Sequence, residues 1–256
     1  MRILFNKFLR LFCIFLIYSV FVGCSTMTKI DETRIIDSSD PFESSNRAVF
    51  SFNERLDEYL MKPLASKYTT FTPKPVRSGV TNFFNNIEYI NVILSTSLQG
   101  KLDQSISDVF RFLFNSTLGV AGLFDVAPPM GFKTHREDLG QTFAVWGVTQ
   151  GPYLTLPALG PRTTRDMPSL VSNYFLNPLN YISTTVALPA TFLNIINKRA
   201  NFLNLTSLRD SAAIDAYLFT REAYLQSRRS LIYDGDPPPE DDFDDIFELD
   251  LEDNTL

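Results

Sequence analysis

Apolar side chains recur every three or four residues along two long stretches of the chain, which is the spacing of one face of an α-helix. The first stretch predicts a helix over residues 80–98, and the second predicts a helix over 102–118. Gly100 and Gly119 follow these stretches, at positions where helices commonly end. Each predicted helix therefore has one apolar face and one polar face.

Two further stretches with helical spacing lie nearer the ends of the patterned region. The first covers residues 46–60 and is bounded by Pro41 and Pro63, and the second covers residues 210–232. No strand alternation of comparable length appears, and no internal repeat is found. The pattern predicts an all-α fold.

The middle of the chain is depleted of charge. The 59 residues of 139–197 contain three charged side chains, Arg162, Arg165 and Asp166, where ordinary usage would give about fifteen. Glycines and prolines interrupt this segment so often that no apolar helix of about 20 residues can form. Irregular backbone cannot face lipid directly, because its amides would lack partners. We therefore expect short helices in or near a membrane; the alternative is a soluble protein with a large core.

The N-terminus has the features of a bacterial lipoprotein precursor. Basic residues precede an apolar run over 11–22 that is too short for a stable membrane span, and small residues follow. The tetrad ending at Cys24 resembles a lipobox, so we expect residues 1–23 to be a signal peptide and Cys24 to carry lipid. An ordinary cleavage site that leaves a free thiol is the alternative. Ser25 after the cysteine favours the outer membrane.

Charge and polarity divide the rest of the chain. Residues 24–39 are expected to form a polar tether, and residues 40–235 the helical domain. Residues 236–256 contain ten carboxylates and no Lys or Arg, so we expect a disordered acidic tail. Without the tail the mature chain is nearly neutral. It lacks the clustered basic surface of a nucleic-acid-binding protein.

Catalytic groups are scarce. His135 is the only histidine, and it lies among charged residues, where a solvated or salt-bridged loop position is expected. No G-x-S-x-G motif is present, and no Cys/His spacing suits a metal. The sequence predicts a protein that is not an enzyme and uses neither a metal nor a cofactor.

Several long motifs resemble the MlaA/VacJ outer-membrane lipoproteins, and together they cover about residues 40–235. They are "DPFESSNRAVFSFNERLDEYLMKPLASKY", "VRSGVTNFFNN", "LQGKL", "RFLFNSTLGVAGLFDVA", "EDLGQTFAVWGVTQGPYLTLPALGPRTTRD" and "SAAIDAYLFTREAYLQSRR". The chain departs from the family pattern at Ser44-Ser45, at Leu139, at Arg162 and in the acidic tail.

The resemblance implies a ring of amphipathic helices embedded in the inner leaflet of the outer membrane. The ring would surround a central amphipathic channel and have short Gly/Pro-rich loops. The implied function is removal of mislocalised phospholipids from the outer leaflet, which maintains lipid asymmetry. The implied partners are phospholipids, a trimeric porin and a periplasmic lipid carrier of the Mla system. The alternatives are a structural lipoprotein that binds porins without moving lipid, and a phospholipase, which the missing Ser/His site disfavours.

The resemblance also assigns candidate roles to residues of its motifs. Candidates for the wall or gate of the channel are Gly140, Gln141, Trp146, Gly147, Gly151, Pro152 and Tyr153. Trp146 and Tyr153 could instead lie at the membrane interface. The opening motif could supply a helix cap and an Arg–carboxylate pair, or a gate, through Asp40, Pro41, Glu43, Asn46 and Arg47. Arg165 and Asp166 are expected to form an ion pair, with contact to a lipid head group as a second role.

Overall fold

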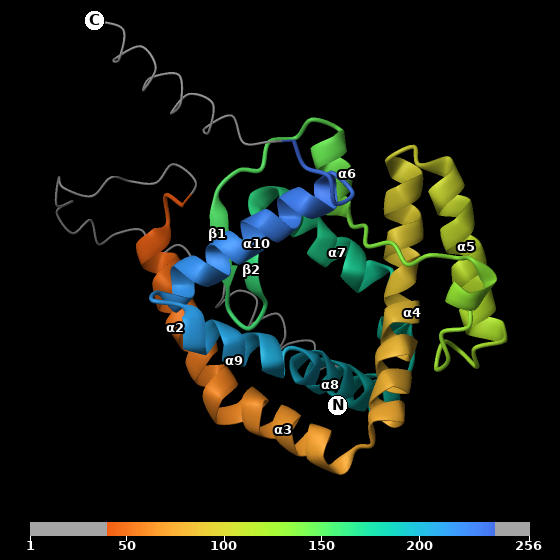
Figure 1. Ribbon diagram of the computed structural model, residues 1–256, viewed down its shortest axis with the longest axis horizontal. Coiled ribbons are helices and arrows are strands. Elements are labelled where there is room, and N and C mark those ends of the chain that lie inside the picture. The colour runs from red at the N-terminus through yellow and green to blue at the C-terminus, as the bar shows by residue number, and fades with distance from the viewer. Residues whose placement is uncertain (1–39, 239–256) are drawn as a thin grey trace, which may run out of the picture. The chain divides into compact units, whose positions relative to one another are not determined.

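The computed structural model describes residues 40–238, from the opening motif to the start of the tail (Figure 1). The predicted signal peptide, the polar tether with Cys24, and the tail beyond residue 238 lie outside the described residues.

The first helical stretch passes straight through Pro63. It consists of α2 (Glu43–Leu56), a π-helical turn η1 (Asp57–Met61) and α3 (Lys62–Phe71). The predicted end of a helix before Pro63 is therefore wrong. Proline cannot donate to the carbonyl four residues back, and its ring clashes with that carbonyl. The wide turn before Pro63 accommodates the ring, and the Lys62 amide donates to Asp57, five residues back.

The two helices with the clearest pattern are confirmed and lie side by side in Figure 1. They are α4 (Lys74–Leu98) and α5 (Leu102–Thr117). Helix α4 begins six residues before the predicted start, because a proline is well accommodated in the first turn, where its missing N–H needs no partner.

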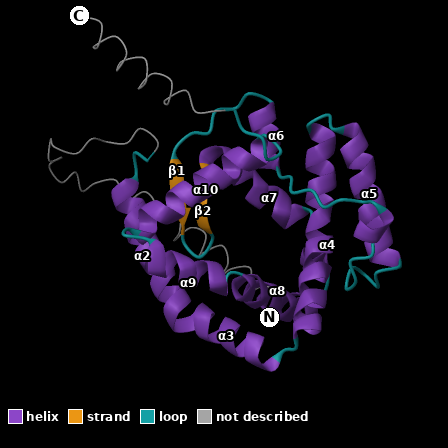
Figure 2. Cartoon of the chain, viewed as in Figure 1, coloured by secondary structure: helices purple, strands orange, loops and turns teal. Residues whose placement is uncertain are grey.

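The charge-depleted middle forms mostly short elements, as expected, and a small hairpin that the pattern did not predict (Figure 2). Its last helix corrects the expectation of short helices throughout, because it has 18 residues and continues through Pro189. Strand β1 (Tyr153–Leu156) pairs antiparallel with β2 (Gly160–Thr163), and Tyr153 lies opposite Thr163. The helical elements of this region are α6 (Leu139–Val145), η3 (Thr164–Asp166), α7 (Met167–Phe175), η4 (Pro178–Tyr181) and α8 (Thr184–Asn201).

The last predicted helix is divided in two, which corrects the expectation of one helix over 210–232. Helix α9 (Leu203–Ala212) ends before Asp215, and α10 (Ala216–Ile232) begins after it. The Asp215 carboxylate accepts hydrogen bonds from the amides of Tyr217 and Leu218, which makes it the N-cap of α10. This bonding explains why the helix is divided at Asp215, because an aspartate whose side chain accepts from nearby backbone amides favours the start of a helix over its interior.

Contacts between elements come from distant parts of the chain. Helix α3 packs on α8, α4 packs on α5, α6 and α8, and α10 packs on α6, α9 and the hairpin. Strand β1 packs on α2. No helix within residues 40–238 is both long enough and apolar enough to cross a bilayer.

Burial within residues 40–238 is the reverse of that in a water-soluble protein. Twenty polar or charged residues are buried, against eight hydrophobic ones. Large apolar side chains are exposed on most helices, among them Phe71, Ile106, Phe110, Leu113, Phe175, Leu188, Phe192 and Leu205. Large exposed apolar side chains in such number are unusual for a water-soluble protein and are typical of surfaces that contact lipid or protein.

Candidate functional site

Four side chains of α10 form a buried polar stripe, which we call the α10 stripe. They are Tyr217, Arg221, Tyr224 and Arg228, at spacings of four, three and four residues, so they lie on one face of the helix. Both arginines are nearly fully buried. A buried guanidinium needs a carboxylate partner, and each half of the stripe has one.

The first half of the stripe holds Asp40, which is 2% exposed. Its carboxylate accepts hydrogen bonds from the Tyr217 hydroxyl, from Arg221 at 3.4 Å and from the Asn46 amide at 2.7 Å. Burial and the neighbouring Asp40 carboxylate raise the pKa of Tyr217, so the phenol keeps its proton and donates. Asp40 therefore attaches the start of the domain to its last helix.

Asn46 also joins α2 to the hairpin. Its amide nitrogen donates to the Tyr153 carbonyl at 3.0 Å, and its oxygen accepts from the Thr155 amide at 2.8 Å. Asn53, two helical turns later, bonds in the same way to Leu156 and Ala158. The outer edge of β1 would otherwise present unpaired backbone groups. Two asparagines on one face of α2 satisfy them.

The second half of the stripe holds Asp166, which is also 2% exposed. Its carboxylate accepts hydrogen bonds from the Tyr224 hydroxyl and from Arg228 at 2.7 Å. Arg228 also contacts Asp138 at 2.5 Å. Burial alone would raise the pKa of Asp138, but the Arg228 hydrogen bond and charge outweigh burial and lower it.

The expected pair between Arg165 and Asp166 is corrected by this arrangement. Within residues 40–238, Asp166 forms its ion pair with Arg228, and Arg165 donates instead to the Val148 carbonyl at 3.3 Å. The side chains of adjacent residues in a helical turn point in different directions. Arg228 reaches Asp166 because α10 lies against this region.

Two glycines of the central motif sit where a side chain would not fit. A Cβ at Gly140 would lie 2.2 Å from an Asp166 oxygen and 2.7 Å from an Arg228 nitrogen. A Cβ at Gly151, which has a left-handed φ of +66°, would lie 1.9 Å from the Thr164 hydroxyl. These glycines allow close packing around the stripe and the hairpin.

The other residues of the central motif divide into a buried and an exposed group. Tyr153 is 1% exposed and contacts the rings of Tyr217 and Tyr224 edge-on, which does not fit the alternative position at a membrane interface. Gln141 is buried, and Pro152 is partly buried beside Tyr153. Trp146 is 55% exposed, with its indole N–H donating to the Leu98 carbonyl, and Gly147 follows it at an exposed turn.

The opening motif forms the expected Arg–carboxylate pair but not the expected cap. Arg47 lies 2.6 Å from Glu43 and also contacts Asp215 at 2.8 Å. Helix α2 begins after Phe42 without a side-chain cap, so capping by this motif is wrong. Asp40 is used instead for the contact with α10, and Pro41 lies in the exposed turn between Asp40 and the helix.

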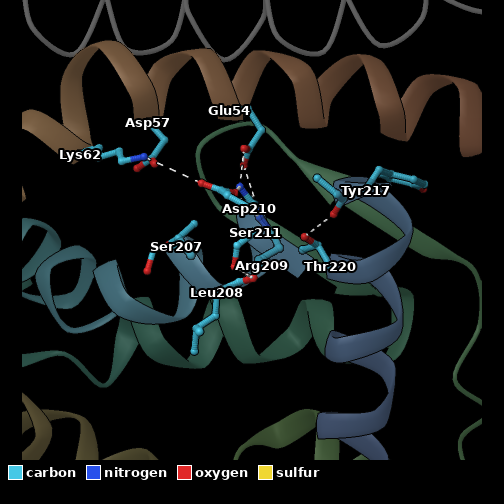
Figure 3. Close-up of polar contacts among 12 residues, drawn as sticks. Glu54, Asp57, Lys62, Ser207, Leu208, Arg209, Asp210, Ser211, Tyr217 and Thr220 are labelled. Carbon is cyan, nitrogen blue, oxygen red and sulfur yellow. Dashed lines mark hydrogen bonds and ion pairs between the residues drawn. The ribbon is translucent and has the colours of Figure 1, made fainter. Parts of the chain in front are cut away.

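Ion pairs attach α9 to the long first helix. Arg209 donates to Glu54 with two N···O distances of 2.9 and 2.6 Å, and Lys62 lies 3.9 Å from Asp210. Figure 3 shows both contacts as dashed lines. Arg199 of α8 bonds to Asp57 through two nitrogens in the same region. The sequence patterns gave no indication of these long-range pairs.

A cavity of about 630 Å³ lies against one broad face of α4. Its lining also includes residues of α5, α6, α7, α8 and α10 and of the segment before α6. Seven asparagines line it: Asn82, Asn85, Asn86, Asn91, Asn115, Asn173 and Asn201. Three apolar residues, Val92, Phe202 and Leu231, complete a lining that is otherwise polar.

His135 lines this cavity and is held by a buried carboxylate. Its Nδ1 lies 2.7 Å from Asp108, which is fully buried and also accepts from the Tyr89 hydroxyl at 2.8 Å. His135 thus lies in a loop and contacts a carboxylate. Among the described residues, no group of three His, Cys, Asp or Glu side chains is arranged to hold a metal ion.

The sequence patterns missed the α10 stripe and the asparagine lining. A signal for the stripe was present, because "YLFTREAYLQSRR" contains Tyr-x-x-x-Arg twice, seven residues apart. The asparagines carry no signal of their own, since amides line helices in many soluble proteins. Their convergence depends on four helices, α4, α5, α7 and α8, that meet in space.

The fold and the site define a mostly helical protein with many buried polar side chains, a cavity lined mainly by polar residues, and many exposed apolar side chains. The sequence profile of the MlaA lipoproteins matches residues 38–231, and the chain belongs to this family.

Named relatives agree with this assignment. The chain is 31% identical to the intermembrane phospholipid transport system lipoprotein MlaA of Escherichia coli K12 over 254 residues, which is 95% of this chain and 99% of the relative. It is 36% identical over 204 residues to an uncharacterized protein of Rickettsia felis, covering 79% and 81% of the two chains.

A solved structure shares the fold. It superimposes with a TM-score of 0.67 at 30% identity and covers 76% of this chain and 99% of its own. That structure was described in work on the structural basis for maintenance of bacterial outer membrane lipid asymmetry.

Proposed function

We propose that this protein removes mislocalised phospholipids from the outer leaflet of the outer membrane and passes them to a periplasmic lipid carrier. One observation carries the proposal: polar side chains are buried and line a cavity, whereas large apolar side chains cover the outer surface. Membership of the MlaA lipoprotein family and the named relatives support it.

The proposed mechanism follows from the two parts of a phospholipid. The tails need apolar surroundings and the head group needs polar ones, so a route across a leaflet must offer both. We propose that the helices form a ring in the inner leaflet, with their exposed apolar faces in the acyl chains. The polar cavity would then give head groups a path, and the central motif from Gly140 to Tyr153 would form part of its wall.

The step needs no bond chemistry and no nucleotide. The lipid moves from a site where it is misplaced to a carrier, and any energy input belongs to later steps. We therefore propose a transport component and not an enzyme, with the Asp108–His135 pair serving to hold a loop in place.

The proposed location follows from the N-terminus and the family. A lipid attached at Cys24 would hold the protein at the periplasmic face of the outer membrane, and several acyl chains make such anchoring firm. A porin trimer and the periplasmic carrier of the Mla system are the proposed partners. The competing proposal is a lipoprotein that binds porin without moving lipid.

Blocking the cavity tests the proposal in cells. Asn85 lines the cavity with an exposed side chain, so Asn85→Trp should obstruct it. Asn204, exposed on α9 away from the lining, provides Asn204→Trp as a matched control. We expect the first variant to raise outer-leaflet phospholipid to the level of a deletion strain, measured by labelling surface-exposed lipid amines, and the second to leave it unchanged.

A photocrosslinker at Asn173, another exposed lining residue, adds a direct readout. Capture of diacyl phospholipid at Asn173 supports a lipid passage if the capture disappears when Asn85→Trp is introduced into the same chain. If deletion leaves outer-leaflet phospholipid unchanged and the crosslinker captures only protein, the scaffold proposal is correct and transport is rejected.

A further inference from the structure

The carboxylates that line the cavity all have cationic partners. Four ion pairs place a lysine or arginine within 3 Å of these acids: Glu88 with Lys198, Asp125 with Arg111, Glu137 with Lys101, and Asp138 with Arg228. An anion that entered the cavity would therefore meet few uncompensated negative charges.

Arg136 differs from the other cations that line the cavity. Its side chain is exposed, and no carboxylate within residues 40–238 lies at ion-pair distance from its guanidinium. Among the described residues that line the cavity, Arg136 thus carries a guanidinium charge that is left over after these pairs are formed. A phosphodiester carries one negative charge and would balance it.

The backbone that carries Arg136 is fixed on both sides. Buried Gln141 donates to the Arg136 carbonyl at 2.9 Å, and the His135 amide donates to the Tyr89 hydroxyl at 3.2 Å. Glu137 accepts hydrogen bonds from Gln99, Lys101 and Gln104. Because the backbone at Arg136 is already held in place, binding of a ligand to its side chain costs no further backbone entropy.

We infer that Arg136 forms a subsite for the phosphate of a phospholipid head group inside this cavity, with the exposed amides of Asn85 and Asn173 as further donors. Guanidinium groups bind phosphate oxygens through two parallel hydrogen bonds, and such charge-assisted bonds are stronger than neutral ones. Gln141 acts as a positioning residue, since it holds the Arg136 backbone. The inference rests on the proposed function and adds the point of recognition to it.

Equilibrium binding to the full-length protein in neutral detergent tests the subsite, with native mass spectrometry as readout. The probes are dioleoylphosphatidylglycerol, dioleoylglycerol, which has the same tails without phosphate, and inorganic phosphate as competitor. We expect Arg136→Gln to weaken phosphatidylglycerol binding by about tenfold or more, the scale of one hydrogen bond to a charged group. Dioleoylglycerol binding should not change.

Two variants provide controls. Arg55 is exposed on α2 and outside the cavity lining, so Arg55→Gln removes the same charge elsewhere and should leave both lipids unaffected. Arg136→Lys keeps the positive charge but lacks the two parallel N–H donors of a guanidinium. It should therefore bind phosphatidylglycerol more tightly than Arg136→Gln and less tightly than the unsubstituted protein.

The outcomes separate the two proposals. Equal affinity of the unsubstituted protein for the two lipids, or equal losses for Arg136→Gln and Arg55→Gln, would overturn the subsite and leave transport standing. Binding of inorganic phosphate without any binding of phosphatidylglycerol would mean a site for free anions and would overturn the lipid subsite. If neither lipid binds and outer-leaflet phospholipid in cells is independent of the protein, the proposed function itself fails.

Discussion

Helices α5 and α10 bury the same kind of side chain but present different outer surfaces. Helix α5 buries Ser105, Asp108, Arg111 and Asn115, and α10 buries Tyr217, Arg221 and Arg228. On the outside, α5 exposes Leu102, Ile106, Val109, Phe110 and Leu113, whereas the exposed residues of α10 include Glu222, Gln226 and Ser227 as well as Leu218 and Phe219.

The difference shows that a polar interior does not determine what lies outside. A helix whose outer face is apolar and whose buried contacts are polar is suited to contact with lipid. A helix whose outer face mixes polar and apolar residues is suited to contact with water or with another protein. The comparison indicates that α5 belongs to the proposed membrane-facing side. Helix α10 belongs to the side where buried polar contacts hold the domain together.

The largest effect is expected from breaking the α10 stripe. Arg228→Met removes the cation of both Asp138 and Asp166, and leaving buried carboxylates unpaired costs about 3–5 kcal/mol of the free energy of unfolding. Thermal unfolding of the full-length protein in detergent, followed by circular dichroism, measures the loss. The exposed Arg55→Met should change the stability by less than about 0.5 kcal/mol. Equal effects of the two variants would contradict a stabilising stripe.

A smaller effect is expected from crowding the same region. Gly140→Ala would place a methyl group 2.2 Å from Asp166, and overpacking of this kind costs about 1–3 kcal/mol. Gly79→Ala on α4 is the matched control, because its Cβ would lie at an ordinary contact distance of 3.5 Å from the Leu123 carbonyl. That variant should be neutral or up to about 1 kcal/mol more stable, since alanine favours helix. A destabilisation of Gly79→Ala as large as that of Gly140→Ala would refute the packing argument.

The last prediction concerns the outer faces and involves no change in stability. Nitroxide labels at Leu113→Cys on α5 and Gln226→Cys on α10 report the surroundings of two exposed positions in reconstituted protein. Oxygen, which concentrates in lipid, should collide more with the first label, and a water-soluble nickel reagent more with the second. The unsubstituted chain, labelled in parallel, supplies the background from any thiol other than the introduced one. Equal access of the nickel reagent to both positions would remove the distinction between the helices.

Much of the helical structure could be predicted from the sequence. The spacing over 80–98 and 102–118 located α4 and α5, because both helices are long and strongly periodic. The passage of the first helix through Pro63 and the division at Asp215 could not be predicted in this way. A wide turn accommodates the proline, and a side-chain bond begins α10, and neither feature has a periodic signal.

The motifs singled out four residues of the buried network but neither their partners nor the lining of the cavity. The motifs pointed to Asp40, Asn46, Gly140 and Asp166, and all four lie in tight contacts of the buried network. Their partners lie far along the chain: Tyr217 is 177 residues from Asp40, and Arg228 is 62 residues from Asp166. Sequence spacing carries no information about contacts at such separations.

The sequence by itself determined helices α4 and α5, their apolar faces and the family, because local periodicity and motifs are present along the chain. The tertiary structure decided which face of each helix is inside. An amphipathic helix has the same pattern whether its polar face points to water or to a polar interior. Only the contacts of α10 with Asp40 and Asp166, and the convergence of asparagines on one cavity, placed the polar faces inward.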